Sequence, residues 1–141
     1  MDTEDAKNFE ARAAVMANFF DSIEVAPGVH ANGEFTLGEN IADHGGLQVS
    51  YQAFKKATAA APLKIENGFT PEQRFFLSYA NVWAGNIRPE EILKRTKTDP
   101  HSLGKWRVDG ALPQIGAWYE AFNITEKDPM YLPVDKRVSI W

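Results

Sequence analysis

The stretch that decides the fold is residues 70–83, which read TPEQRFFLSYANVW. Threonine is a favoured residue at the position before a helix, and proline is favoured at the first helical position, which Pro71 occupies. Apolar side chains then recur at helical spacings over a wide part of the helix surface. The segment therefore predicts a helix that begins at residue 71 and is buried on most sides.

Outward from this helix, similar apolar spacings predict further helices. They cover residues 4–24, 38–61, 90–96 and 114–122. The apolar face of the first of these consists of Phe9, Ala13, Met16, Phe20 and Ile23. No strand-like alternation of apolar and polar residues is sustained, so we expect a mainly α fold in a single helical domain of residues 1–141.

The remaining segments predict connections. Residues 25–37 contain the turn signals Pro27-Gly28 and Asn32-Gly33 and indicate an irregular loop. Residues 97–113 indicate an ordered loop with short helical turns. The last segment, residues 123–141, predicts an extended tail that returns apolar groups to the body. These groups are Met130, Leu132, Val138, Ile140 and Trp141.

Composition excludes several classes of function. The chain has 141 residues, 44% of them hydrophobic, and a net charge of −4, so it lacks the basic surface that binds nucleic acid. There is no cysteine, which excludes disulfides, thiol catalysis and thiolate metal sites. No apolar run approaches the roughly 20 residues of a membrane span. The acidic N-terminus is not a signal peptide.

Two carboxylates form the first candidate site. Glu39 and Asp43 are four residues apart, so on a helix they project from one face. A glutamate can ligate zinc, and a carboxylate one turn later can hold a histidine ligand by its ring N–H. The alternative is a capping box, in which Glu39 caps the backbone N–H of Thr36 and Asp43 is a solvated charge.

The second candidate site is the segment from Thr98 to Arg107. His101 follows Asp99 by two residues, and a neighbouring carboxylate can orient or charge a histidine. A histidinium and an arginine together suit a site where negative charge develops on oxygen during amide hydrolysis. The alternative is that Asp99 caps a turn, His101 is partly exposed and Arg107 makes a surface ion pair.

A third possibility is a metal site built from His30, Glu39 and His44, although this spacing matches no known ligand pattern. The chain contains no His-Glu-x-x-His motif, no Gly-rich phosphate loop and no Gly-x-Ser-x-Gly turn. By generic motifs, the sequence has no complete active site.

Four ordered segments together resemble one family. Residues 32–47 read NGEFTLGENIADHGGL and are similar to the signature of the neprilysin and endothelin-converting-enzyme family. The three matches that follow in the same order are residues 75–83, residues 88–90, and residues 98–102 with Arg107. The short tail that ends in Trp141 is also similar to that of the family. The helix around residues 7–9 resembles the one that precedes the signature. The resemblance therefore covers nearly all of the chain.

The resemblance implies a fold and a set of roles. The fold would be the C-terminal helical part of a thermolysin-like (gluzincin) catalytic domain, with an extended tail. Glu39 would complete a His/His/Glu zinc site, and Asp43 would orient a zinc-bound histidine. His101 would stabilise the oxyanion of the transition state, and Arg107 would bind a backbone carbonyl of the peptide substrate.

Departures from the family pattern limit these expectations. The His-Glu-x-x-His helix, with two zinc ligands and the general base, would lie upstream, as would the Asn-Ala motif and the large N-terminal domain. The sequence thus reads as a truncated gene product or an excised piece, and the missing cysteine points to a bacterial protein. We expect weak zinc binding and no peptidase activity from this chain alone.

Two further expectations concern partners and location. The partners would be a peptide substrate, the missing N-terminal part of the same enzyme, and a second copy through exposed apolar surface. The family implies a periplasmic, secreted or membrane-anchored protein that faces outward. The rival interpretation is a non-catalytic remnant that binds a peptide or a partner chain.

Overall fold

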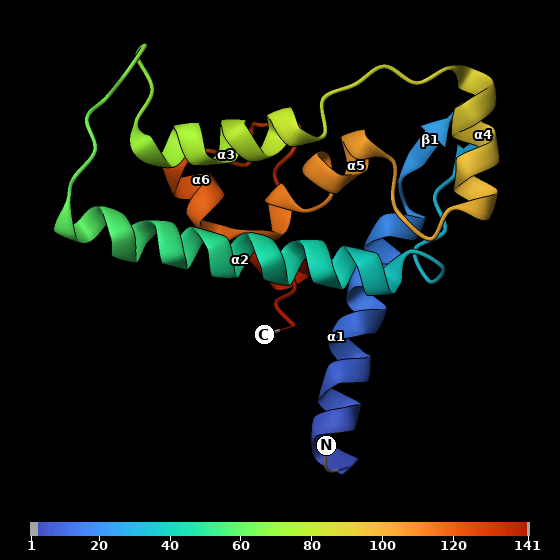
Figure 1. Cartoon of the computed structure of the whole chain (residues 1–141). Coiled ribbons are helices and arrows are strands. Elements are labelled where there is room, and N and C mark those ends of the chain that lie inside the picture. Colours follow the sequence, from blue (N-terminus) through green and yellow to red (C-terminus); the bar gives the residue numbers. More distant parts are fainter. Residues whose placement is uncertain (1–2, 141) are drawn as a thin grey trace.

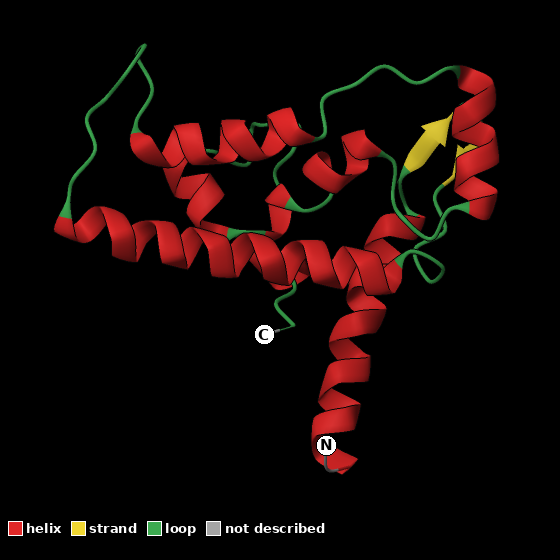
Figure 2. Cartoon of the chain, in the orientation of Figure 1, coloured by secondary structure: helices red, strands yellow, loops and turns green. Residues whose placement is uncertain are grey.

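The computed structural model describes residues 3–140, and most of these residues are helical (Figure 2). The helices within this range are α1 (Thr3–Asp21), α2 (Leu37–Ala60), α3 (Pro71–Val82), α4 (Pro89–Thr98), α5 (Gly104–Asp109) and α6 (Gly116–Phe122). Short 3-10 turns are η1 (Leu112–Gln114) and η2 (Val134–Lys136). The mainly α fold predicted from the sequence is confirmed. None of the helices within residues 3–140 is both long and apolar enough to cross a membrane.

The start of α3 follows the local sequence. The Thr70 hydroxyl accepts a hydrogen bond from Gln73 N (3.2 Å), and the Gln73 side chain accepts one from Thr70 N (3.0 Å). With Pro71 at the first helical position, these reciprocal bonds form a capping box. The predicted start of this helix is therefore confirmed.

An aromatic core lies between α2, α3 and α6. Phe76 of α3 is 1% exposed and packs with Leu47 of α2 and Trp118 of α6. The Tyr51 ring stacks on Phe76 with centroids 5.1 Å apart, and Phe75 meets Phe76 edge to face at 5.3 Å. This core fixes α3 against α2, the helix that carries the candidate residues Glu39 and Asp43.

A second core joins the end of α1 to the start of α2. Met16 and Phe20 of α1 pack with Ile41 of α2 and with Val138 and Ile140 of the tail. The predicted return of the tail is thus confirmed for Val138 and Ile140, whereas Trp141 lies outside the described residues. Other tail residues, Met130 and Leu132, are half-buried.

The N-terminal half of α1 differs from the expectation. It projects away from the body (Figure 1), and Phe9, assigned to the buried face, is 37% exposed. The helix also ends at Asp21 rather than near residue 24. Ile23 is buried, as predicted, but it belongs to the segment after the helix. Apolar spacing identified the helix but could not show how much of its length meets a neighbour.

Part of the predicted irregular loop forms a hairpin. Strands β1 (Glu24–Ala26) and β2 (Val29–His30) pair antiparallel around Pro27 and Gly28. Gly28 has a φ of +71°, a conformation that favours glycine. The turn signal was correct, but strands of three and two residues are too short to show alternation.

The loop into α2 is held tightly against α1. The Asp21 carboxylate accepts a hydrogen bond from Gly33 N at 2.6 Å. A Cβ atom at Gly33 would lie 2.0 Å from the Ala17 carbonyl oxygen, so only glycine fits this approach. The first turn of α2, with Glu39 on it, is positioned by this contact.

Candidate functional site

Glu39 lies in the first turn of α2 and does not cap it. Thr36 precedes the helix, but its side chain makes no capping bond; its hydroxyl donates to the Asn32 carbonyl at 2.9 Å instead. The Thr36 N–H also donates to the Asn32 carbonyl (3.0 Å), so it does not bond Glu39. The capping-box interpretation is therefore wrong. The Glu39 side chain is 44% exposed, which leaves its carboxylate accessible.

His101 stands next to this carboxylate. Its Nε2 atom lies 3.3 Å from Glu39 Oε2. On the other side of the ring, Asp99 Oδ1 accepts hydrogen bonds from His101 N (3.0 Å) and from His101 Nδ1 (2.8 Å). The bonds from the His101 backbone and side chain lower the pKa of Asp99 to about 2, so it stays ionised and holds the ring.

Arg107 pairs with Asp43. Its Nε and Nη2 atoms donate to the two Asp43 oxygens at 2.7 and 2.6 Å, a two-point pair between residues 64 positions apart. The side chains are only 15% and 14% exposed. The bond to Asp43 raises the pKa of Arg107, so the guanidinium stays charged. Its Nη1 donors remain for another acceptor.

Thus the structure brings together all four residues predicted from the two separate motifs. Glu39 meets His101, and Asp43 meets Arg107. A buried hydrogen bond from Ser102 Oγ to Asn40 Oδ1 (2.7 Å) adds a third link between residues 98–107 and α2. The alternative for the loop was half right, since Asp99 does cap a turn and His101 is 42% exposed, but the Arg107 pair is not a surface pair.

Two residues near Arg107 were not recognised from the sequence. The Tyr79 hydroxyl donates to the Arg107 carbonyl oxygen at 2.7 Å, and the guanidinium carbon lies 3.8 Å from the centre of the Trp83 ring. Both residues belong to the segment 70–83, which predicts a helix buried on most sides. The sequence gives one sign that they act together: they are four residues apart, so they lie on the same side of α3 and its C-terminal end.

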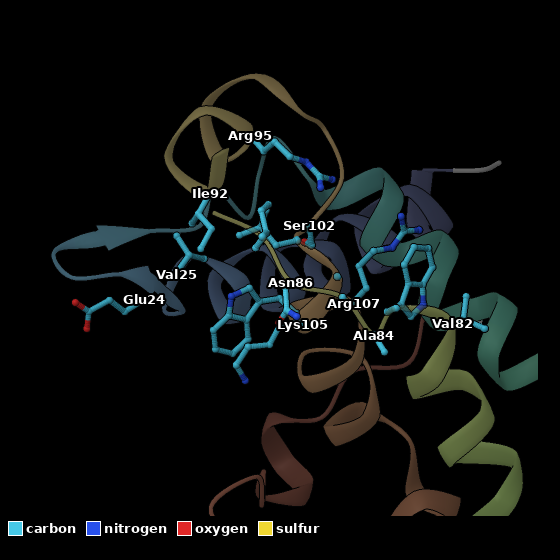
Figure 3. Close-up of a pocket in the computed structure, with 16 residues that line it drawn as sticks. Glu24, Val25, Val82, Ala84, Asn86, Ile92, Arg95, Ser102, Lys105 and Arg107 are labelled. Atoms are coloured by element: carbon cyan, nitrogen blue, oxygen red, sulfur yellow. The ribbon is translucent and has the colours of Figure 1, made fainter. Parts of the chain in front are cut away.

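A cavity of about 620 Å³ opens beside Arg107 (Figure 3). Its walls come from β1, the segment after α3, α4 and the start of α5. Apolar lining residues include Val25, Val82, Ile87, Ile92, Leu103 and Trp106. The cavity offers apolar contact next to a charged donor, a combination typical of ligand sites.

The remaining histidines do not join Glu39. His30 bonds the Asp21 carbonyl oxygen through Nδ1 (3.1 Å), at the end of α1. His44 is 1% exposed, and the Gln48 amide lies 3.2 Å from its Nε2 atom. Its Nδ1 atom has no hydrogen-bond partner among residues 3–140. The nearby Gln114 backbone raises the pKa of His44, but by less than burial lowers it. Among residues 3–140 no three metal-binding side chains converge, which argues against a site built from His30, Glu39 and His44.

Burial of His44 predicts a pH-dependent stability. Burial lowers the pKa of His44 below its ordinary value of 6.5, because the charged ring loses hydration. The unfolded chain therefore binds more protons as the pH falls below 6.5, and the folded state loses stability in that direction. Urea unfolding between pH 7 and 5 should show a steeper loss in the wild type than in His44→Gln. His30→Gln is the control and should keep the wild-type slope; equal slopes in all three proteins would refute the assignment.

Comparison with known proteins gives the class of the chain. Human neprilysin is 36% identical over 141 residues, which cover 96% of this chain and 18% of neprilysin. Bovine endothelin-converting enzyme 1 is 37% identical over 125 residues, with 86% and 16% covered. The structure of the zinc metalloprotease Zmp1 of Mycobacterium tuberculosis superposes with a TM-score of 0.94 at 31% identity, covering 99% of this chain and 22% of Zmp1. These similarities relate the chain to a class of peptidases that includes the zinc metalloprotease Zmp1.

The particular family follows from the model of Peptidase family M13, which matches residues 1–138. The chain belongs to peptidase family M13. It spans about a fifth of the length of the relatives it matches. The predicted resemblance and the fold class derived from it are confirmed.

Proposed function

We propose that this chain forms part of a zinc metalloendopeptidase that hydrolyses peptide bonds in oligopeptides. It would supply the third zinc ligand together with residues that bind the substrate and the transition state. The single observation that carries the proposal is a pair of contacts that α2 makes with residues 98–107, Glu39 with His101 and Asp43 with Arg107. Family membership supports it, because relatives in the family include a zinc metalloprotease.

Each residue has a proposed task. Glu39 offers one carboxylate ligand for zinc, which fits its accessible, uncapped position. When bound, zinc supplies a Lewis acid that polarises the scissile carbonyl group. His101, held by Asp99, would donate a hydrogen bond to the carbonyl oxygen as its negative charge grows.

Arg107 and Asp43 would act together. The Nη1 donors of Arg107 would bind a backbone carbonyl of the peptide, which would lie along the adjacent cavity. Asp43 fixes the guanidinium, and its free lone pairs could accept the ring N–H of a histidine ligand. The Asp43 carboxylate would then position both the Arg107 guanidinium, which binds the substrate, and a histidine that ligates zinc.

The remaining ligands and the general base would come from residues outside this chain. Within residues 3–140, Glu39 has no metal-binding partners that converge with it, whereas the relatives are about five times longer than the matched segment. We propose that residues 1–141 form one helical domain of such a peptidase. An outward-facing location goes with this proposal, and one relative is named membrane metallo-endopeptidase-like 1.

We expect no chelator-sensitive peptide hydrolysis from this chain alone, because one ligand cannot hold zinc in a catalytic geometry. A chimera in which the chain replaces the matching segment of Zmp1 should hydrolyse a fluorogenic peptide, since the two backbones superpose closely. The comparison uses both proteins with and without a chelator. Robust chelator-sensitive cleavage by the chain alone would contradict the proposal.

A non-catalytic binding module is the second candidate, favoured by apolar groups exposed near the site. Val82 is 68% exposed and Leu77 is 42% exposed, both on α3. If this surface is where the chain binds a second copy, sedimentation velocity should detect a dimer that Val82→Ser weakens. In the peptidase proposal, residues of the longer enzyme cover this surface instead.

A further inference from the structure

The end of α3, with Trp83 directly after it, contacts helix α5 at three points. The roles proposed for the four catalytic and binding residues do not explain these contacts. The Tyr79 hydroxyl donates to the Arg107 carbonyl oxygen at 2.7 Å. The Trp83 ring faces the Arg107 guanidinium at 3.8 Å. A Cβ atom at Gly104, the first residue of α5, would lie 2.9 Å from the Trp83 carbonyl oxygen. The end of α3 therefore presses directly on the short helix that carries Arg107.

The contact with Tyr79 acts on the backbone of Arg107. Helix α5 has only six residues, so most of its carbonyl groups lie near its end and need hydrogen-bond donors from outside the helix. Tyr79 supplies the partner for the Arg107 carbonyl from a different helix. The hydroxyl is well suited to remain a donor, because burial and the nearby Asp43 charge raise the pKa of Tyr79 to about 12.

The contact with Trp83 acts on the side chain of Arg107. Asp43 already binds the Nε and Nη2 donors along one edge of the guanidinium, and the indole covers one face. A cation over an indole ring is attracted by the ring's negative face. Together, the carboxylate and the ring leave the Nη1 side of the guanidinium as the part open to a ligand.

We propose that Tyr79 and Trp83 are positioning residues that hold Arg107, Tyr79 through its backbone and Trp83 through its side chain, in the orientation that binds a substrate carbonyl. The proposal rests on the proposed function only in one respect, that the group bound by Arg107 is a substrate carbonyl. That Tyr79 and Trp83 restrain Arg107 is a property of this chain and can be measured without zinc or substrate.

The test follows the Arg107 Nε–H signal by nuclear magnetic resonance in the 15N-labelled chain. Tyr79→Phe removes one hydroxyl and keeps the ring, so the core stays filled. Loss of one hydrogen bond should speed hydrogen exchange of the Arg107 Nε–H about fivefold. Tyr51→Phe makes the same chemical change in the aromatic core next to Phe76 and should leave the Arg107 signal unchanged.

Trp83 is tested by a pair of substitutions. Trp83→Leu removes the aromatic face and should shift the Arg107 Nε–H signal downfield, whereas Trp83→Phe should restore part of the ring-current shift. An Arg107 exchange rate in Tyr79→Phe equal to that of the wild type would overturn the role of Tyr79, even if the variant unfolds at a lower temperature. An unchanged shift in Trp83→Leu would overturn the role of Trp83.

Kinetic measurements on the Zmp1 chimera distinguish a failure of the positioning roles from a failure of the proposed peptidase function. Tyr79→Phe should raise KM about fivefold and change kcat little, because it disturbs a group that binds the substrate. An inactive chimera, together with the expected changes at Arg107 in the chain, would leave the positioning roles standing and contradict the proposed function. Normal KM values together with an unchanged Arg107 signal would contradict the positioning roles alone.

Discussion

Glu39→Gln in the Zmp1 chimera is expected to lower zinc-dependent peptide hydrolysis by at least about 100-fold. Residues that merely support a metal ligand cost 10- to 100-fold when replaced, so loss of a direct carboxylate ligand should reach or exceed that range. Glutamine keeps the size of the side chain and removes the charge that attracts the metal. Steady-state kinetics at saturating zinc would measure the effect, and metal analysis after dialysis would show the loss of bound zinc.

Glu34→Gln is the matched control for this variant. Glu34 lies five residues earlier on the exposed surface of the loop into α2 and carries the same charge. The Glu34→Gln substitution should leave the rate of hydrolysis and the zinc content at the level of the parent chimera. Equal activity of the Glu39→Gln chimera and its parent would remove Glu39 from the metal site.

Phe76→Ala is expected to reduce the free energy of unfolding of the chain by about 3–5 kcal/mol. The Phe76 side chain is 1% exposed and contacts the rings of Tyr51 and Phe75, so its removal leaves a cavity between α2 and α3. Urea unfolding followed by circular dichroism would measure the change.

The control for Phe76 is Phe35→Ala, which removes the same ring from a 44% exposed position before α2. This change should cost less than about 1 kcal/mol, as is usual for an exposed position. A similar loss in both variants would mean that the aromatic core does not hold α2 and α3 together.

The helices could be predicted because their signals are local. The Thr70–Pro71 start of α3 depends on residues within one turn, and its capping box involves only Thr70 and Gln73. The same local reasoning failed at Thr36, whose hydroxyl bonds the Asn32 carbonyl in the preceding turn. A threonine followed three residues later by glutamate permits a capping box, but competing local bonds decide whether it forms.

The site could be predicted only in part, because its geometry depends on contacts between distant segments. The family resemblance identified Glu39, Asp43, His101 and Arg107, but no sequence pattern joins Asp43 to Arg107 across 64 positions. Likewise, Tyr79 and Trp83 read as core residues of α3. Their second contact, with Arg107, became visible only once the packing of α3 against α5 was known.

The central claim is that Glu39 is a zinc ligand completed by residues outside this chain. An experimental structure of the Zmp1 chimera with zinc tests it most directly. We predict a Glu39 carboxylate oxygen about 2.0–2.2 Å from the metal, with nitrogen ligands from the Zmp1 portion. Zinc bound with the Glu39 carboxylate turned away, or held by other residues of this chain, would contradict the claim.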